Sequence, residues 1–186
     1  MHAVQKGRAA GLFRRITSGL ALAGVGGLAL LVLCGALGAR FNRTPSLAVG
    51  LYWSVDRPLE KGSYVMFCPP QTAIFDEARK RRYIGRGNCA GDYVPLIKRV
   101  LGMPGDVVAI TAKEVSVNGV ALPLSSSLQT DAAGNPMPQP ALRNFTLGPA
   151  ELLLMSDVNP KSFDGRYFGA IQRDRIRHVL RPVITW

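Results

Sequence analysis

Histidine and cysteine are scarce in this sequence of 186 residues, which contains 2 histidines and 3 cysteines. The histidines, His2 and His178, lie far apart in the chain, and no Cys-x-x-Cys pair is present. The usual spacings of zinc ligands therefore cannot be assembled from these residues. We expect no metal and no other cofactor.

Acidic residues are absent from the first 40 positions, although the chain as a whole has 12 of them. The same stretch carries Lys6, Arg8, Arg14 and Arg15, and the formal net charge of the chain is +11. Charge placed so unevenly is typical of a membrane topology signal. Nucleic acid is not an expected partner, because no aromatic residues are interleaved with the basic cluster at residues 79–82. Contact of these basic residues with anionic membrane lipid is the simpler expectation.

Residues 17–39 carry no charge and are long enough to cross a hydrocarbon core of roughly 30 Å as a helix. We interpret them as a transmembrane helix that follows a cytoplasmic basic N-terminus at 1–16 and precedes an extracytoplasmic domain at 40–186. The predicted location is the cytoplasmic (inner) membrane, with a single pass and the domain in the periplasm. The alternative is a cleaved secretory signal with a small-x-small site at Ala36–Gly38.

Short apolar runs with a period of two follow this segment, and Gly, Pro, Asn and Asp separate them. The period predicts strands, and Asn118-Gly119 is typical of a two-residue hairpin turn. Residues 71–82 differ, because their apolar positions are spaced for a short surface helix. The expected fold class is therefore mostly β, an antiparallel β body with one N-terminal transmembrane helix and a short surface helix. The predicted strands are Leu51–Val55, Ser63–Phe67, Val107–Ile110, Glu114–Val117, Glu151–Met155 and Ile176–Ile184.

The tract from about 120 to 150 is rich in Ser, Pro, Asn and Gly and has little periodic apolar content. This composition predicts a long excursion over the surface of the domain. We find no internal repeat and no coiled-coil heptad along the chain.

The three cysteines are distributed between the predicted transmembrane helix and the predicted domain. Cys34 lies in the apolar helix, whereas Cys68 and Cys89 lie in the domain. If the domain is exported, the latter two can form a disulfide, while Cys34 remains a small apolar side chain in lipid. Two free thiols in the domain are the alternative.

Lys98 lies in an apolar run that begins at Leu96 and continues through Val100. In a strand these three side chains share one face, so the amine would point inward. Burial disfavours the charged amine and can lower its pKa from about 10.4 by up to roughly 3–5 units. A neutral lysine amine can serve as the base that activates a serine hydroxyl. The alternative is an ordinary strand lysine with its amine in water.

Three segments carry a specific pattern when taken together. They are Thr44-Pro-Ser-Leu-Ala-Val-Gly-Leu-Tyr-Trp53, Lys98-Arg-Val-Leu-Gly-Met-Pro-Gly-Asp106 and Ser162-Phe-Asp-Gly-Arg166. In this order, after a membrane anchor, they resemble the signal peptidase family (type I, Ser-Lys serine peptidases). The first segment is most similar to the conjugative-transfer branch, whose members mature pilins, because it contains Gly50-Leu-Tyr-Trp53. Ala48-Val49 replaces the family's usual Pro-Thr, a departure that argues against a general housekeeping role. The resemblance extends over nearly the whole chain except the tract from about 120 to 150.

The resemblance implies a role for each matching residue. Ser46 is the implied nucleophile, Lys98 is its general base, and the Ser46 N–H and the Thr44 hydroxyl form the oxyanion hole. The same resemblance implies three supporting residues: Ser162, Asp164 and Arg166. A capped turn at 44–46 and a polar loop at 159–166 are the simpler alternatives.

The implied function is that of a membrane-anchored serine endopeptidase with a Ser-Lys dyad. Its expected partner is a precursor protein, small and secreted or membrane-inserted, such as the prepilin of a conjugative type IV secretion system. The resemblance admits both a hydrolysed and a cyclised product. The alternatives are a general type I signal peptidase, a soluble Ser-Lys autoprotease and an anchored assembly scaffold. The apolar helix and the lack of a DNA-binding module argue against the autoprotease.

Overall fold

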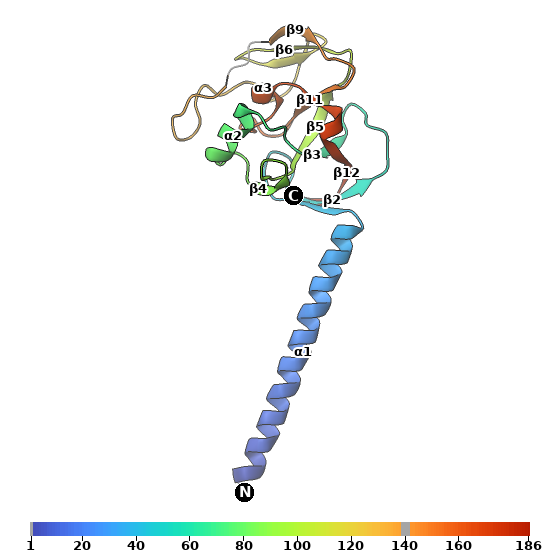
Figure 1. Cartoon of the computed structure of the whole chain (residues 1–186), viewed down its shortest axis with the longest axis vertical. Coiled ribbons are helices and arrows are strands. Elements are labelled where there is room, and N and C mark those ends of the chain that lie inside the picture. Colours follow the sequence, from blue (N-terminus) through green and yellow to red (C-terminus); the bar gives the residue numbers. More distant parts are fainter. Residues whose placement is uncertain (1, 139–141) are drawn as a thin grey trace. The chain divides into compact units, whose positions relative to one another are not determined.

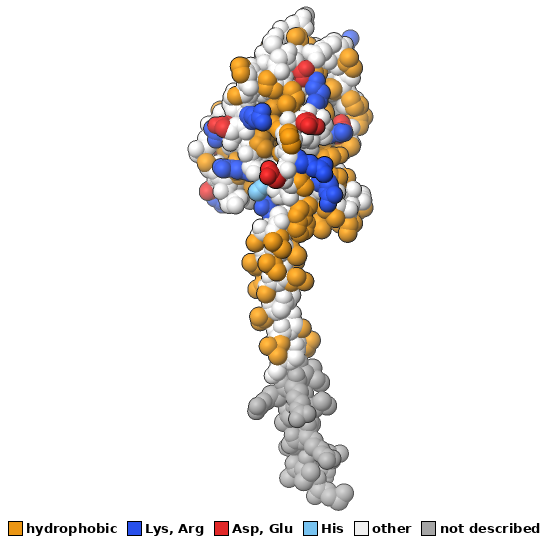
Figure 2. Space-filling view, turned by 90° about the vertical axis from the view of Figure 1, so that its right-hand side faces the viewer, with side chains coloured by type: hydrophobic (Ala, Val, Ile, Leu, Met, Phe, Trp, Pro, Cys, Tyr) orange, Lys and Arg blue, Asp and Glu red, His pale blue; other side chains and the backbone are white. Residues whose placement is uncertain are grey.

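The computed structural model describes residues 2–138 and 142–186 and divides the chain into two units, Met1–Ala39 and Arg40–Trp186. The first unit is a helix, α1, at His2–Ala36 (Figure 1). Within it Thr17–Ala36 has a hydropathy of 2.2, and the described side chains of this stretch form an apolar surface without charge (Figure 2). A helix of this length and composition is consistent with a membrane anchor or a signal sequence.

The helix ends before the limit predicted from the sequence, which was residue 39. Gly38 has a φ of 110°, a conformation that favours glycine, and Ala39 already begins the first strand. The chain therefore leaves the helix at a glycine. A prediction from hydropathy takes no account of the backbone conformations open to glycine, so it placed the end of the helix too late.

The second unit contains a seven-stranded sheet with the order β1-β2-β12-β3-β5-β10-β11. Strand β12 pairs antiparallel with β2 and β3, and β5 pairs antiparallel with β3 and β10. These pairs place β5 in the interior of the sheet. The strands are β1 Ala39–Asn42, β2 Gly50–Val55, β3 Tyr64–Phe67, β5 Leu96–Gly102, β10 Glu151–Met155, β11 Ile171–Gln172 and β12 Ile176–Thr185.

A four-stranded sheet with the order β8-β7-β6-β9 forms the other part of this unit. Its strands are β6 Val107–Ile110, β7 Val115–Val117, β8 Val120–Ala121 and β9 Leu142–Thr146. Asn118 and Gly119 join β7 to β8 with φ angles of 52° and 78°, so the predicted two-residue turn is confirmed. The mostly β, antiparallel fold class with an N-terminal apolar helix is confirmed as well.

Strand β10 contributes to two separate clusters of buried side chains. Leu152 and Leu154 belong to one cluster, whereas Leu153 and Met155 belong to the other. Successive side chains of a strand point to opposite faces, so a strand that is covered on both faces is apolar without alternation. The unbroken apolar run of β10 is explained by this position.

The short surface helix predicted at 71–82 is α2, Ala73–Lys80, which buries Phe75 and Ala78. A disulfide joins Cys68, just after β3, to Cys89 at the end of β4, Arg86–Cys89. It closes the loop that contains α2. The remaining cysteine, Cys34, is free.

The tract expected as a surface excursion is integrated into the domain at several points. It includes β8 and β9, and it buries Ser125, Met137 and Leu147. Strand β9 gains its place through backbone pairing with β6, which does not depend on an alternating apolar pattern. Residues 139–141 of this tract lie outside the described residues.

Candidate active site

Asn42 organises the loop that carries Ser46. This asparagine ends β1, is 4% exposed, and donates from Nδ2 to the carbonyl oxygens of Thr44, Leu47 and Ala48 at 2.9, 3.2 and 3.1 Å. Its Oδ1 accepts from the backbone N–H and the hydroxyl of Thr44 at 3.2 and 3.1 Å. One buried amide thus fixes the turn before the serine. The sequence reasoning missed Asn42, although an asparagine two residues before Thr44-Pro45 is a known turn signal.

Ser46 itself is partly exposed, and its Oγ lies 3.2 Å from Thr44 Oγ1. A second loop contacts the same turn, because Asn159 donates from Nδ2 to the carbonyl oxygen of Pro45 at 3.0 Å. The serine is therefore held between β1 and the 156–164 segment. This position leaves its hydroxyl accessible while the surrounding backbone is fixed.

Lys98 lies on β5 with 3% of its surface exposed, as the apolar pattern predicted for an inward-facing residue. Its Nζ donates to Ser162 Oγ at 2.7 Å. Burial lowers the pKa of Lys98 to about 8, with Asp164 opposing and Arg166 assisting the shift. A substantial fraction of the amine is consequently neutral near physiological pH.

Asp164 and Arg166 form a fully buried ion pair, in which Arg166 donates from Nε to Oδ1 at 2.8 Å and from Nη2 to Oδ2 at 3.0 Å. Asp164 also accepts from the N–H of Ser156 at 3.0 Å and caps α3, Gly165–Phe168. Such a pair is costly to desolvate and more costly to break. Arg166 Nη1 reaches across the fold to the carbonyl oxygens of Leu124, Ser126 and Pro160 at 2.8, 3.1 and 2.9 Å.

A cavity of about 210 Å³ brings several of the predicted residues together. Thr44, Ser46, Lys98 and Ser162 line it, and its walls contain both polar and apolar side chains. Asp164 and Arg166 are absent from the described lining and lie buried beside it, which suits the supporting role predicted for them. The other lining residues are Pro45, Tyr83, Ile84, Leu96, Asn159, Lys161 and Phe163.

His178 is a histidine that could act as a base, and it belongs to a different hollow. Its Nε2 lies 3.1 Å from Arg40 Nη2 and its Nδ1 lies 3.0 Å from Ser54 Oγ. A guanidinium can only donate, so Nε2 accepts and Nδ1 carries the proton that it donates to Ser54. Burial, then Arg40 and Arg177, lower the pKa of His178. This histidine is therefore a neutral donor toward Ser54.

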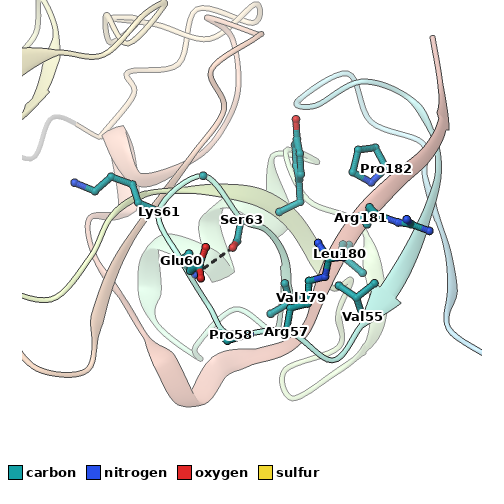
Figure 3. A pocket seen from close by; sticks show the side chains of 12 residues that line it. Val55, Arg57, Pro58, Glu60, Lys61, Ser63, Val179, Leu180, Arg181 and Pro182 are labelled. Carbon is teal, nitrogen blue, oxygen red and sulfur yellow. Dashed lines mark hydrogen bonds between the residues drawn. The ribbon is translucent and has the colours of Figure 1, made fainter.

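A larger hollow of about 430 Å³ lies between β12 and the loop that precedes β3 (Figure 3). Glu60 N–H donates to Ser63 Oγ at 3.1 Å within it, and Arg57, Lys61 and Arg181 line its walls. Neither Ser46 nor Lys98 is among its described lining residues. Its greater volume does not mark it as the site of chemistry, because no buried amine faces a serine there.

Comparison with known proteins accords with this geometry. Residues 14–184 match the family described as signal peptidase, peptidase S26. The chain is 51% identical over 175 residues to a plasmid transfer protein TraF of Escherichia coli, covering 94% of this chain and 98% of that protein. It is 40% identical over 152 residues to a conjugal transfer protein TraF of Agrobacterium tumefaciens (strain 15955), covering 80% and 84%.

Among solved structures, a signal peptidase I from Enterococcus faecalis V583 matches with a TM-score of 0.40 and 21% identity, covering 69% of this chain and 100% of that one. The family match spans most of the chain, and both transfer proteins are similar along more than four fifths of their length. The chain therefore belongs to the signal peptidase family, peptidase S26, as its three sequence segments predicted.

Proposed function

We propose that this protein is a serine endopeptidase in which Ser46 is the nucleophile and Lys98 is the general base. The observation that supports this proposal best is a buried lysine amine with a pKa near 8 in the same cavity as an accessible serine. Membership of a peptidase family supports the interpretation of these two residues as nucleophile and base. Lys161 also lines the cavity, but it is exposed and lacks the burial that disfavours a charged amine.

In the proposed reaction Ser46 Oγ attacks the scissile carbonyl carbon, and its proton passes to the neutral Nζ of Lys98. Lys98 then returns this proton to the leaving amine, so the base is regenerated as the acyl-enzyme forms. Ser162 accepts a hydrogen bond from Nζ and orients the amine. In the free enzyme Ser46 Oγ contacts Thr44, and catalytic hydrogen bonds often tighten only in the substrate complex.

The oxyanion of the tetrahedral intermediate would accept hydrogen bonds from the Ser46 N–H and the Thr44 hydroxyl. The Thr44 hydroxyl donates to Asn42 Oδ1 in the free enzyme, so it must turn from that acceptor toward the oxyanion. Removing one such donor costs on the order of 10²–10³ in rate. The loss on Thr44→Ala, with Thr44→Ser as the hydroxyl-retaining control, measures this contribution.

The substrate we propose is a small precursor protein, the prepilin of a conjugative type IV secretion system. Support comes from the relatives named for plasmid and conjugal transfer, which match over 98% and 84% of their length. The acyl-enzyme can be resolved by water or by an amine of the same precursor, giving a linear or a circular product. The rival proposal is a general type I signal peptidase. If that proposal holds, expression of this protein should restore growth to a strain depleted of its own signal peptidase.

We further propose that α1 anchors the protein in the cytoplasmic membrane, with residues 1–16 inside and the domain at 40–186 outside. The apolar stretch Thr17–Ala36 and the Cys68–Cys89 disulfide both support this arrangement, since disulfides persist in oxidising compartments.

The decisive experiment compares matched variants in a precursor cleavage assay on purified, folded protein. Ser46→Ala and Lys98→Ala should each abolish processing, because the nucleophile and its base act as a unit. Ser54→Ala, which removes the hydroxyl facing His178, and Lys161→Ala should retain processing. Substantial cleavage by folded Ser46→Ala or Lys98→Ala would end the Ser-Lys assignment. Loss of function in folded Ser46→Ala also excludes a purely structural scaffold.

A further inference from the structure

A second hollow, of about 310 Å³, adjoins the candidate active site and is not used by the proposed chemistry. We call it the α2 groove, because α2 forms one of its sides. Tyr83 and Phe163 line both the groove and the cavity of Ser46 and Lys98. The centroids of these two rings are 5.6 Å apart, so the two hollows share an aromatic wall. The apolar residues that line the groove include Ala73, Ile74, Ala78, Tyr83, Pro136 and Phe163.

The sides of the groove are fixed by contacts that connect α2 to the segment around Pro136. Tyr83 donates its hydroxyl proton to Asp131, and Arg81 Nη1 donates to the carbonyl oxygen of Pro136 at 2.8 Å. Asp131 in turn accepts from the N–H groups of Ala133 and Asn135, both at 2.8 Å. A hollow built by such contacts exists before anything binds, which lowers the entropic cost of binding.

The chemistry of the groove favours an uncharged occupant. The charged groups at its rim are Glu77 and Arg81, which pair with each other at 2.7 Å. The Tyr83 hydroxyl already has a partner in Asp131. A charged side chain would therefore lose water without gaining a partner, whereas an aliphatic or aromatic one would bury apolar surface.

We propose that the α2 groove is a substrate subsite that binds one apolar side chain of the precursor, of the size of leucine or phenylalanine. This inference rests on the proposed function, since it takes Ser46 as the position of the scissile bond. Because Tyr83 and Phe163 line both hollows, an extended chain with its scissile bond at Ser46 can continue past these two rings into the groove.

Binding to the full-length Ser46→Ala protein in detergent tests this subsite without consuming the peptide. The probes are fluorescein-labelled dodecapeptides with alanine throughout, into which a single leucine or a single aspartate is placed at each position in turn. We expect leucine at one or two adjacent positions to tighten binding on the order of tenfold relative to the all-alanine peptide. Aspartate at the same positions should give no gain.

Ala73→Trp fills the groove from an exposed position on α2, and Ala121→Trp makes the same change at an exposed position on β8. We expect Ala73→Trp to remove the gain from leucine while leaving affinity for the all-alanine peptide unchanged. Ala121→Trp should keep the gain. A leucine effect that is absent at every position, or that both variants remove equally, would overturn the subsite, as would an equal gain from aspartate.

The test of the subsite and the test of the proposed function can fail independently of each other. If Ser46→Ala still cleaves the precursor, the nucleophile is wrong, while a leucine gain that only Ala73→Trp removes still identifies the subsite by binding. If Ser46→Ala is inactive and no leucine position matters, the endopeptidase stands and the subsite fails.

Discussion

Lys98 is placed so that desolvation, opposed by the charge of Asp164, sets its protonation. Below pH 8 the ammonium form dominates and cannot accept a proton from Ser46, so kcat/KM should fall about tenfold per pH unit there and level off above pH 8. A profile of kcat/KM against pH for a peptide substrate gives the apparent pKa of this rising limb in the free enzyme. An apparent pKa near 10.4 would mean that the amine is not desolvated. A limb near 6.5 that disappears in His178→Ala would mean that the base is the histidine.

Asp164 has two separable effects that one substitution can expose. Its negative charge raises the pKa of Lys98, so Asp164→Asn should move the activity limb to lower pH. The same change leaves the fully buried Arg166 without its counter-ion, which should destabilise the fold by about 3–5 kcal/mol. The limb position and the urea midpoint of the folded variant test the two effects. Asp174→Asn, at an exposed carboxylate, is the matched control and should change neither.

Residue chemistry was predictable from sequence where it depended on near neighbours in the chain. The alternation around Lys98 predicted an inward-facing amine, and β5 places it so. The reach of Arg166 to carbonyl oxygens of Leu124 and Ser126 was not predictable, because it depends on how two distant segments pack. Asn42 is intermediate, since its turn signal is local but its contacts with Leu47 and Ala48 need the folded loop.

At the scale of elements, the loop between β1 and β2 depends on the Asn42 side chain. Asn42→Ala removes the acceptor for Thr44 and the donor to three carbonyl oxygens, so Ser46 and the oxyanion donors lose their fixed positions. Misplacement by about 1 Å can cost on the order of 10² in rate, and kcat should fall by that order. Kinetics on the purified variant check this.

Asn118→Ala provides the matched control for that change, since it removes side-chain hydrogen bonds at the β7–β8 turn of the other sheet. It should lower the midpoint of unfolding without a comparable loss of kcat. Equal losses of kcat in the two variants would show that Asn42 acts through general stability and not through the position of Ser46.

The segment between β3 and β4 is closed by the Cys68–Cys89 disulfide, with a sequence separation of 21. Chain-entropy estimates give a loop of this size roughly 3 kcal/mol of stability. The Cys68→Ala/Cys89→Ala protein should unfold at a correspondingly lower urea concentration, and the wild type should match it when a reductant is present. An unchanged midpoint would show that α2 is held by packing alone. When unreduced protein from the cell envelope is treated with an alkylating reagent, neither of these two cysteines should be modified.

The strands illustrate the same division between local and long-range information. Alternating runs predicted β2, β3, β6 and β7, and Asn118-Gly119 predicted the hairpin turn that follows β7. Strands β1, β4, β9 and β11 were missed, because such short segments become strands only when a partner offers its backbone groups. The division of the strands into two sheets, and of the buried side chains into one cluster on each face of β10, likewise depends on packing.

For the whole molecule, the arrangement of charge around the apolar stretch predicts a single pass with the C-terminal domain outside the cytoplasm. Thr17–Ala36 has 20 residues, which at about 1.5 Å per residue span roughly 30 Å as a helix. The basic residues that precede it favour a cytoplasmic N-terminus, and Arg40 and Arg43 oppose that preference only weakly. A reporter that is active only in the periplasm should therefore function when fused after Trp186. A cytoplasm-dependent reporter at the same position is the matched control and should be inactive.

The same fusion distinguishes a membrane anchor from a cleaved signal. An apolar helix that remains uncleaved should keep the protein in the membrane fraction through a carbonate wash, because transfer of its side chains into water is unfavourable. Replacing two leucines of the exposed helix surface, Leu28 and Leu31, by arginine should weaken this retention, since charge at mid-bilayer is costly. Release of the unmodified protein by carbonate, with a shortened N-terminus by mass spectrometry, would favour the cleaved signal. In that case the domain acts as a periplasmic protein, and its access to membrane-inserted precursors must come from the domain surface alone.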